Sequence, residues 1–516
     1  MPSILLFDFK DFEFDFKGFK KMPDNTDILS TLNPEQLTAV TAPNRGSLLV
    51  LAGAGCGKTA VLTRRIVFLA RSGIPTSRVC ALTFSRKAAE EMAHRLAKLD
   101  PSCGGQNAPL VTTFHAFALR VLQEKYEGVS NFSRIGFDGG AELLETRQRL
   151  ETLAQVSTTA MRKALGMGIM ELDSALDLLS TFPEKASEKW AGADIELLAK
   201  IDRAFSEARR SRGLWDFSDL IGGCIELFRS HPPIAAAYAS RFDAILVDEF
   251  QDTNPQQIDL LDMLLASGAT LYAVGDDDQA IYGFRGADIR PIRNFTARFR
   301  DAGIVKLQIN YRSIPAILNC ANRLWVDKPA EYRKTLVSGL KALPTGCKRP
   351  ETARFGTQAQ MLDWALDMAR TLARREGIPV NTMAMLFRLN DSIASVNEYY
   401  KNKGLSSDEI PLMLTIHASK GLEYPVVFLC DMEEGVFPHY RLKKEARIDT
   451  WMDFVKEIIN PRPKPGADCD LEEELRLFYV GVTRAMRWLY FAAAAKKPFH
   501  GRMTNFAPSR FLRLVK

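Results

Sequence analysis

The chain has 516 residues, more than one hydrophobic core usually serves, so we expect about three or four domains or subdomains. With 46% apolar and 25% charged residues it has the composition of a globular protein. No apolar run approaches the roughly 18 residues of a membrane span, and we expect no membrane partner. The net charge of +6 is compatible with a polyanionic partner but does not identify one, because binding depends on how charges cluster.

The cysteines and the N-terminal segment bear on the compartment. Eight cysteines stand at positions 56, 80, 103, 224, 320, 347, 430 and 469. They form no CxxC pair, and no histidine lies at ligand spacing, so we expect reduced thiols in a cytoplasmic protein. Residues 1–26 form an N-terminal extension that is no secretory signal, because acids interrupt its apolar stretches. Its alternatives are disorder, a strand or docking peptide built on the phenylalanines, and a true start at Met22.

The sequence SLLVLAGAGCGKT at 47–59 predicts a strand, a glycine-rich turn and a helix start. In such a P-loop the backbone N–H groups converge on phosphates, Lys58 adds a positive charge and the Thr59 hydroxyl binds Mg²⁺. Ala52 replaces the first glycine of the strict pattern. The residues expected to line the nucleotide are Ala52, Gly53, Ala54, Gly55, Cys56, Gly57, Lys58, Thr59 and Ala60.

A P-loop needs a second strand that ends in a metal-binding carboxylate, and AILVDEFQDT at 244–253 fits that need. Four apolar residues precede Asp248, which we expect to bind the metal. Glu249 is expected to orient or deprotonate the attacking water. The alternative is a strand that ends in a solvated acidic turn.

The stretch GDDDQAIYGFRG at 275–286 follows the apolar run LYAV, which predicts a further core strand. Because ligands of such sheets bind at the carboxyl ends of strands, we expect Gln279 near the γ-phosphate. Tyr282, Phe284 and Arg285 offer aromatic faces and a cation to unstacked bases. Packing of this loop into a neighbouring domain is the alternative.

These residues resemble the UvrD/Rep family of superfamily 1A DNA helicases, and further motifs similar to those of the family follow in order along most of the chain. They are LNPEQLTAV at 32–40, ALTFSRKAAEEM at 81–92, TTFHAF at 112–117, WDFSDL at 215–220, QINYRS at 308–313, LTIHASKGLEYPVVF at 414–428 and LEEELRLFYVGVTRA at 471–485.

The resemblance implies ATP and Mg²⁺ as cofactors. It implies that Gln36 and Tyr311 hold the adenine and Glu423 the ribose, and that Arg312 and Arg484 reach the γ-phosphate across a cleft. Arginines from a second domain would make hydrolysis depend on closure. For each arginine alone, a structural ion pair is the alternative.

The same resemblance implies single-stranded DNA contacts, whose chemistry fits base stacking and phosphate tracking. The implied contacts are Phe84, Thr113, Phe114, His115, Tyr282, Phe284, Arg285, His417 and Lys420. A buried core position is the alternative for either histidine. Two positions depart from the family: Phe284 stands where tryptophan is common, and Ala60 where relatives often place arginine.

We expect an α/β protein with two RecA-like P-loop motor domains. Motor domain 1A is expected at 27–118 and 214–302, and motor domain 2A at 303–516. Residues 119–213 predict a helical 1B-type insertion, in which Arg209, Arg210 and Arg212 either face DNA or end a solvated helix. The family's 2B insertion is expected to be absent near 405–411, because so few residues cannot hold a domain.

The expected function is an ATP-dependent 3′–5′ translocase or helicase on single-stranded DNA and on junctions of single and double strands. The alternative is a DNA-stimulated ATPase subunit that senses DNA ends or gaps and activates a partner nuclease, as in phage defence. A P-loop phosphotransferase with a small-molecule acceptor is a third interpretation, and it predicts an ATPase indifferent to DNA.

Overall fold

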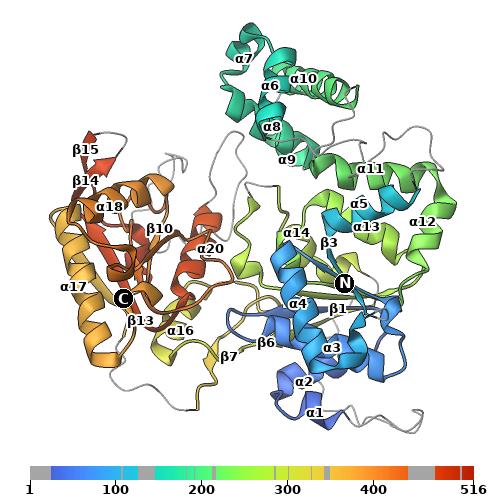
Figure 1. Ribbon diagram of the computed structural model, residues 1–516, viewed down its shortest axis with the longest axis horizontal. Helices are drawn as coiled ribbons and strands as arrows, with labels where there is room; N and C mark the ends of the chain where they lie inside the picture. The colour runs from blue at the N-terminus through green and yellow to red at the C-terminus, as the bar shows by residue number, and fades with distance from the viewer. Residues whose placement is uncertain are drawn as a thin grey trace.

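The computed structural model describes residues 25–105, 108–125, 146–181, 183–190, 192–211, 217–283, 286–299, 301–326, 328–341, 349–439, 471–499 and 502–515. Almost all of the expected N-terminal extension, together with Phe284 and Arg285, lies outside these residues. Among the described helices, none has the length and apolar character to cross a membrane. Two parallel sheets covered by helices form two lobes, with a helical unit beside the first (Figure 1), and this confirms the α/β fold class.

The first lobe is built on a sheet of six strands in which all neighbours run parallel. In spatial order the strands are β3 (Leu110–Thr113), β2 (Val79–Thr83), β4 (Ala244–Val247), β5 (Thr270–Gly275), β1 (Ser47–Ala52) and β6 (Ala302–Leu307). The inner strands are nearly continuous apolar runs, as expected where helices cover both faces.

Alternate residues of the first sheet face two helical layers. Val50 belongs to the apolar cluster of the first layer, whereas Leu49 and Leu51 belong to that of the second. The first layer has α1 (Thr26–Leu29), α2 (Pro34–Thr41), α3 (Lys58–Arg71) and α4 (Arg86–Leu99). The second has α5 (Phe114–Lys125), α11 (Phe217–Ser230), α12 (Pro232–Ala239), α13 (Pro255–Leu265), α14 (Arg290–Arg293) and α15 (Phe295–Arg298).

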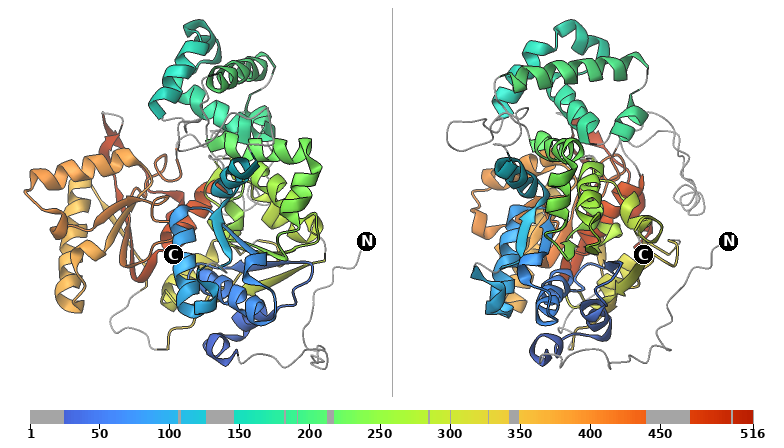
Figure 2. Two further views of the ribbon diagram at one scale, coloured as in Figure 1. Left: turned by 45° about the vertical axis from the view of Figure 1, so that its right-hand side comes forward. Right: turned by 90° about the vertical axis from the view of Figure 1, so that its right-hand side faces the viewer.

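The helical unit stands above the first lobe in Figure 1 and in both views of Figure 2. Its helices are α6 (Thr146–Val156), α7 (Thr159–Leu165), α8 (Ile169–Thr181), α9 (Pro183–Lys189) and α10 (Ala193–Arg210). Apolar residues at helical spacing, among them Leu172, Leu198 and Phe205, give it a core of its own.

The second lobe has a parallel sheet in the order β11 (Leu412–Thr415), β10 (Ala384–Phe387), β12 (Tyr424–Leu429), β13 (Ala485–Ala494) and β9 (Glu351–Phe355). Its helices are α16 (Pro315–Arg323), α17 (Gln358–Glu376), α18 (Asn390–Asn402) and α20 (Leu471–Val482). Two small sheets complete the fold, one of β7 (Ile309–Asn310) with β8 (Val337–Ser338), the other of β14 (Lys496–Phe499) with β15 (Arg502–Asn505).

The lobes share one apolar cluster, which extends from Val61 on α3 through Ile317 and Leu336 to Leu477 on α20.

Two expected boundaries need correction. The first sheet continues past residue 302, because β6 pairs with β1, and α5 packs on the first lobe as far as Leu122. From α18 the chain passes to β11 through a 3-10 helix at Ser407–Glu409.

Candidate active site

The phosphate-binding turn lies at the carboxyl end of β1, where α3 begins. Gly55 and Gly57 have φ of 67° and 85°, the left-handed region that only glycine adopts without strain. A Cβ on Gly57 would stand 2.9 Å from Nε2 of Gln36, so a side chain there would displace the Gln36 amide from Cys56. The first N–H groups of α3 have no partner within the helix, and with Lys58 they form an anion site.

Gln36 and Tyr311, the two residues expected at the adenine, lie beside this turn and are connected through Asn33. Asn33 and Gln36 form a capping box that starts α2, and Gln36 Nε2 donates to the carbonyl of Cys56 at 3.0 Å. Asn33 Nδ2 donates to the hydroxyl of Tyr311 at 2.8 Å. Tyr311 follows β7 and is 45% exposed, so its ring remains open to a flat ligand. Residues distant in sequence are thus brought to one rim of the P-loop.

Asp248 and Glu249 follow β4 and face Lys58, whose Nζ lies 3.3 Å from Oε2 of Glu249. Burial, then the neighbouring Glu249, raises the pKa of Asp248. Burial alone would raise the pKa of Glu249, but the ammonium groups of Lys58 and Lys420 lower it. Burial would lower the pKa of Lys58, yet these carboxylates raise it. The Lys58 ammonium is therefore paired with the ionised carboxylate of Glu249, and the neighbouring carboxyl of Asp248 protonates more readily.

Gln279 connects the first lobe to the second. It ends the 3-10 helix η8 (Asp277–Gln279), and its Nε2 donates to Oδ2 of Asp276 at 2.5 Å. Its Oε1 accepts from Nη2 of Arg484 at 3.1 Å. Arg484 lies between α20 and β13, and burial followed by the nearby Arg312 lowers its pKa. Arg484, one of the two arginines expected at the γ-phosphate, therefore touches Gln279, which is expected at the same phosphate and which we call the sensor glutamine.

Arg312, the other expected arginine, also lies on the second-lobe side of the P-loop. Its Nε donates to Oε2 of Glu423 at 2.6 Å, and its Nη1 donates to the carbonyl of Thr483 at 3.0 Å. A Cβ on Gly55 would lie 2.8 Å from Cβ of Arg312, so the arginine backbone abuts the turn. This ion pair is the structural role that was the alternative for Arg312, and its partner Glu423 is the residue expected at the ribose.

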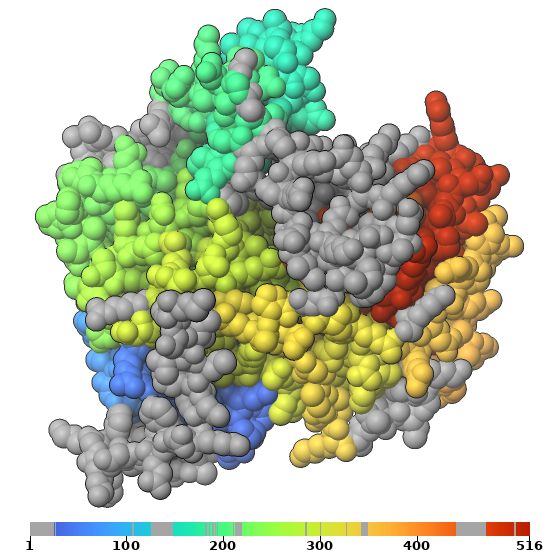
Figure 3. Space-filling model, turned by 180° about the vertical axis from the view of Figure 1, so that it is seen from behind, coloured from blue at the N-terminus to red at the C-terminus, as the bar shows by residue number. Residues whose placement is uncertain are grey.

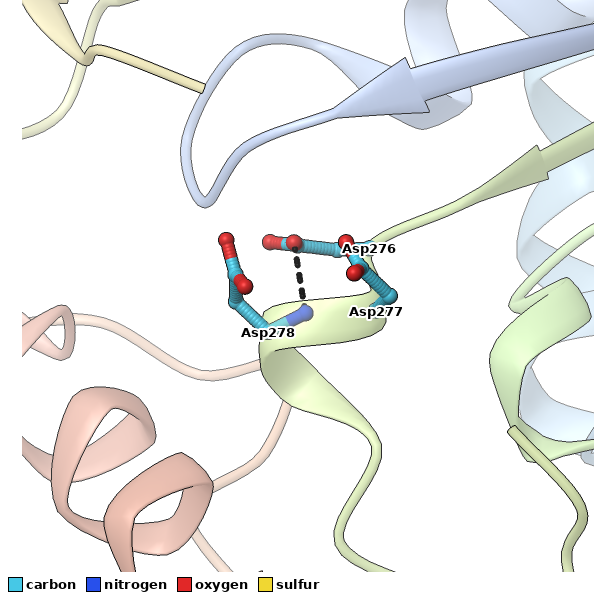
Figure 4. Close-up of side chains that lie close together, drawn as sticks. All are labelled: Asp276, Asp277 and Asp278. Carbon is cyan, nitrogen blue, oxygen red and sulfur yellow. Dashed lines mark hydrogen bonds between the residues drawn. The ribbon is translucent and has the colours of Figure 1, made fainter. Parts of the chain in front are cut away.

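Three carboxylates, those of Asp276, Asp277 and Asp278, lie within 4.8 Å of one another at the start of η8 (Figure 4). This spacing would suit a cation, but Lys334 pairs with all three aspartates and Lys328 pairs with two of them. The protein supplies the balancing charge, and we assign no metal ion here.

An aromatic pair marks the expected DNA side. Phe84 follows β2 and is 41% exposed, and its ring stacks on that of Tyr282 at 5.2 Å with 7° between the planes. Nζ of Lys420 lies 4.8 Å from the centre of the Tyr282 ring. The same ammonium pairs with Asp252 at 2.5 Å and donates to the carbonyl of Gln279 at 2.9 Å. Lys420 therefore touches both the stacked pair and the loop of the sensor glutamine.

The remaining expected DNA contacts are less exposed. Phe114, expected as a base contact, is buried in this structure, and its ring is packed in the core of the first lobe. It begins α5, and helical spacing puts it on the inward face with Phe117. Thr113 is buried, and its Oγ1 accepts from Ala116 N at 3.1 Å. His115 and His417 are half-buried, and burial lowers the pKa of His115.

Arg209 also departs from expectation. It is buried, pairs with Asp219 and lies over the ring of Phe205 at 4.6 Å. It fastens α10 to α11 and neither faces DNA nor ends a solvated helix. The side chain of Arg210 and the whole of Arg212 lie outside the described residues.

Sequence reasoning missed two groups that shape the site. Asn310 stood inside the motif QINYRS, and its Nδ2 donates to the carbonyl of Ala54 at 2.6 Å, so its place in the motif was the available signal. Lys328 and Lys334 lie in a stretch without a motif, and no pattern there pointed to the aspartates.

Comparisons with known proteins identify the family of the chain. A family model described as the UvrD/REP helicase N-terminal domain matches residues 32–300, and one described as the UvrD-like helicase C-terminal domain matches residues 400–496. A probable DNA helicase of Mycoplasma pneumoniae is 32% identical over 494 residues, which are 94% of this chain and 87% of that protein.

Two longer relatives match less of their own length. The ATP-dependent DNA helicase UvrD1 of Mycobacterium tuberculosis is 34% identical over 73% of this chain and 49% of its own. The ATP-dependent DNA helicase PcrA of Staphylococcus aureus is 31% identical over 73% of this chain and 50% of its own. The chain thus spans about half the length of these two relatives.

Proposed function

Because this chain belongs to the UvrD/REP helicase family, we propose that it is an ATP-dependent DNA helicase that moves 3′ to 5′ along single-stranded DNA and unwinds junctions. The observation that carries the proposal is the contact of Gln279 with Arg484 beside the P-loop, where the two lobes meet. The two lobes are the motor domains 1A and 2A, and the helical unit is the 1B-type insertion.

In the proposed mechanism the P-loop amides and Lys58 bind the phosphates of ATP, while Gln36 and Tyr311 flank the adenine. The narrow glycine turn and the neighbouring hydroxyl and carboxylate fit a nucleotide with its cation. Thr59 and Asp248 would hold Mg²⁺, which supplies positive charge against the phosphate oxygens. Glu249 orients the attacking water and accepts its proton.

Coupling to DNA follows from the shared loop. Arg484 and Arg312 approach the γ-phosphate from the second lobe, and Gln279 is bonded to Arg484 at one end and to Asp276 at the other. A change in the distance between the lobes therefore shifts Gln279 and the residues that follow it as far as Tyr282. Because Tyr282 stacks on Phe84 and contacts Lys420, this shift changes the position of the aromatic surface that we propose binds bases.

The deciding experiment measures ATP turnover with and without single-stranded DNA along a salt series, followed by strand separation on duplexes with either a 3′ or a 5′ tail. We expect stimulation that fades with salt, because phosphate contacts release counterions. We expect unwinding of the 3′-tailed duplex. ATPase activity indifferent to DNA would contradict the proposal and favour the phosphotransferase interpretation.

The nuclease-activating subunit gains no support from the relatives, whose names describe helicases. It remains testable in the same assay, because such a subunit would hydrolyse ATP on DNA without separating strands. Strand separation by the isolated chain would exclude it as the sole function.

A further inference from the structure

A short segment that follows α16 lies against two loops of the first lobe, the P-loop and the loop that carries Gln279. We call residues 328–338, which follow α16 and end with β8, the strap. The backbone of Leu336 exchanges two hydrogen bonds with the side chain of Asn322 on α16, at 2.8 and 2.9 Å. The yellow stretch that contains the strap lies between the lobes when the molecule is seen from behind (Figure 3). The strap is also held on the first lobe, because Nζ of Lys306 on β6 donates to the carbonyls of Ala330 and Arg333, and Tyr332 packs in the first-lobe core.

The strap meets the P-loop through Leu336. This side chain is buried, and a Cβ on Gly53 would stand 2.2 Å from its Cδ2. Only glycine permits so close an approach, so the first turn of the P-loop and the strap are packed without a gap. A shift of the strap is thus felt directly at the phosphate-binding backbone.

The lysines of the strap contact the loop that carries Asp276, Asp277, Asp278 and Gln279. Nζ of Lys334 lies 3.0 Å from a carboxylate oxygen of Asp276, 2.7 Å from one of Asp277 and 2.8 Å from one of Asp278. The Lys334 side chain is 1% exposed. Lys328 pairs with Asp277 and Asp278. Because an unpaired buried charge is costly, these five groups hold one another in place.

Asp276 passes this constraint to the sensor glutamine. It accepts from Gln279 Nε2 at 2.5 Å, and its backbone N–H donates to Oε1 of Gln251 at 2.9 Å. Gln251 in turn donates to Glu249 at 2.6 Å. An amide has one donating and one accepting end. Fixing the donating end of Gln279 on Asp276 therefore leaves its oxygen for Arg484.

We propose that Lys334 is a positioning residue for DNA-stimulated ATP hydrolysis. It holds Asp276 so that the Gln279 amide presents its oxygen to Arg484. The inference rests on the proposed function and adds to it a residue outside the recognised motifs.

The test needs a variant that folds. Lys334→Met alone leaves three buried acids with one lysine, and such a protein is expected to be unstable. Lys334→Met combined with Asp277→Asn removes one cation and one anion together, so the charge of the cluster is unchanged. Asp277→Asn alone is the matched control, because the contacts of Lys334 with Asp276 and of Asp276 with Gln279 remain. Circular dichroism and thermal melting check that each variant is folded.

We expect the double variant to lose DNA-stimulated kcat by about 10-fold to 100-fold, with KM for ATP changed less than about 3-fold, since a misplaced group costs rate more than binding. The control should retain kcat within about 2-fold of the wild type. In a Gln279→Ala background the Lys334→Met and Asp277→Asn pair should cause no further loss, because the group that Lys334 positions is gone.

Two results would overturn the inference while leaving the proposed function intact. One is wild-type kcat in the folded double variant. The other is a loss that multiplies in full with that of Gln279→Ala, which would mean that Lys334 acts independently of Gln279. A wild-type chain without DNA-stimulated ATPase activity would overturn the proposed function itself, and with it this inference.

Discussion

Removing the rings of Phe84 and Tyr282, one at a time and together, tests the proposed DNA surface. In the free protein these rings stack on each other at 5.2 Å. If bases bind to these two faces, the self-stack must open first. The substitutions Phe84→Ala and Tyr282→Ala then have two opposing effects on DNA affinity, because each removes a stacking face and each also removes the cost of opening the pair.

The magnitudes follow from the geometry. A base stacked on an aromatic ring contributes roughly 2 kcal/mol, and the self-stack contributes about 1 kcal/mol. Each single variant therefore loses about 1 kcal/mol of binding, a roughly 5-fold rise in Kd. The double variant loses both faces but recovers the self-stack only once, so it loses about 3 kcal/mol, or roughly 150-fold. The double effect thus exceeds the product of the single effects by about 5-fold.

Fluorescence anisotropy with a labelled oligothymidine, at one fixed salt concentration and without nucleotide, measures these constants. Met503→Ala is the matched control, since Met503 is an exposed apolar residue on β15, away from the aromatic pair. Its Kd should equal that of the wild type. Single variants that bind as tightly as the wild type, or a double variant no weaker than the product of the singles, would refute the reasoning.

Three further predictions concern hydrolysis and stability. Lys58→Ala or Glu249→Gln should lower ATP turnover by about 10²-fold or more while DNA binding stays measurable by anisotropy; unchanged turnover in both would remove the assigned site. Arg209→Met should destabilise the helical unit by about 3 kcal/mol, because Asp219 is left without its buried partner, and calorimetry should show recovery on adding Asp219→Asn. Burial alone would raise the pKa of Glu472, but Arg476 and Arg293 lower it below its ordinary 4.5. The unfolded chain therefore binds more protons just below that pH, so acidification should lower the melting temperature of the wild type more than that of Glu472→Gln.

The sequence predicted the elements whose chemistry is local. The glycine turn before Lys58 and the acids after β4 stand where apolar strands end, and a parallel sheet brings such ends to one edge. The resemblance implies that Gln36 and Tyr311 lie at one adenine and that Arg484 reaches the γ-phosphate, and the end of the apolar run LYAV predicts Gln279 near that same phosphate. Spacing alone would not have joined residues so far apart in the chain.

The errors and omissions have physical causes. The resemblance implies DNA contacts along TTFHAF, but apolar residues at helical spacing turn Phe114 inward once α5 forms. Lys334 escaped notice because a lysine in a stretch without a pattern is usually solvated, and only the tertiary fold places it among three aspartates. The expected end of the first motor domain at residue 302 is too early, because β6 belongs to the first sheet only through its pairing with β1. No local signal in the sequence marks that pairing.

The apolar cluster that joins the lobes bears on the temperature dependence of the motor. It is continuous from α3 through α16 to α20. Any separation of the lobes exposes part of this surface to water, and hydrating apolar surface raises the heat capacity. The enthalpy of opening then changes with temperature. The turnover rate should therefore trace a curve, not a straight line, against inverse temperature.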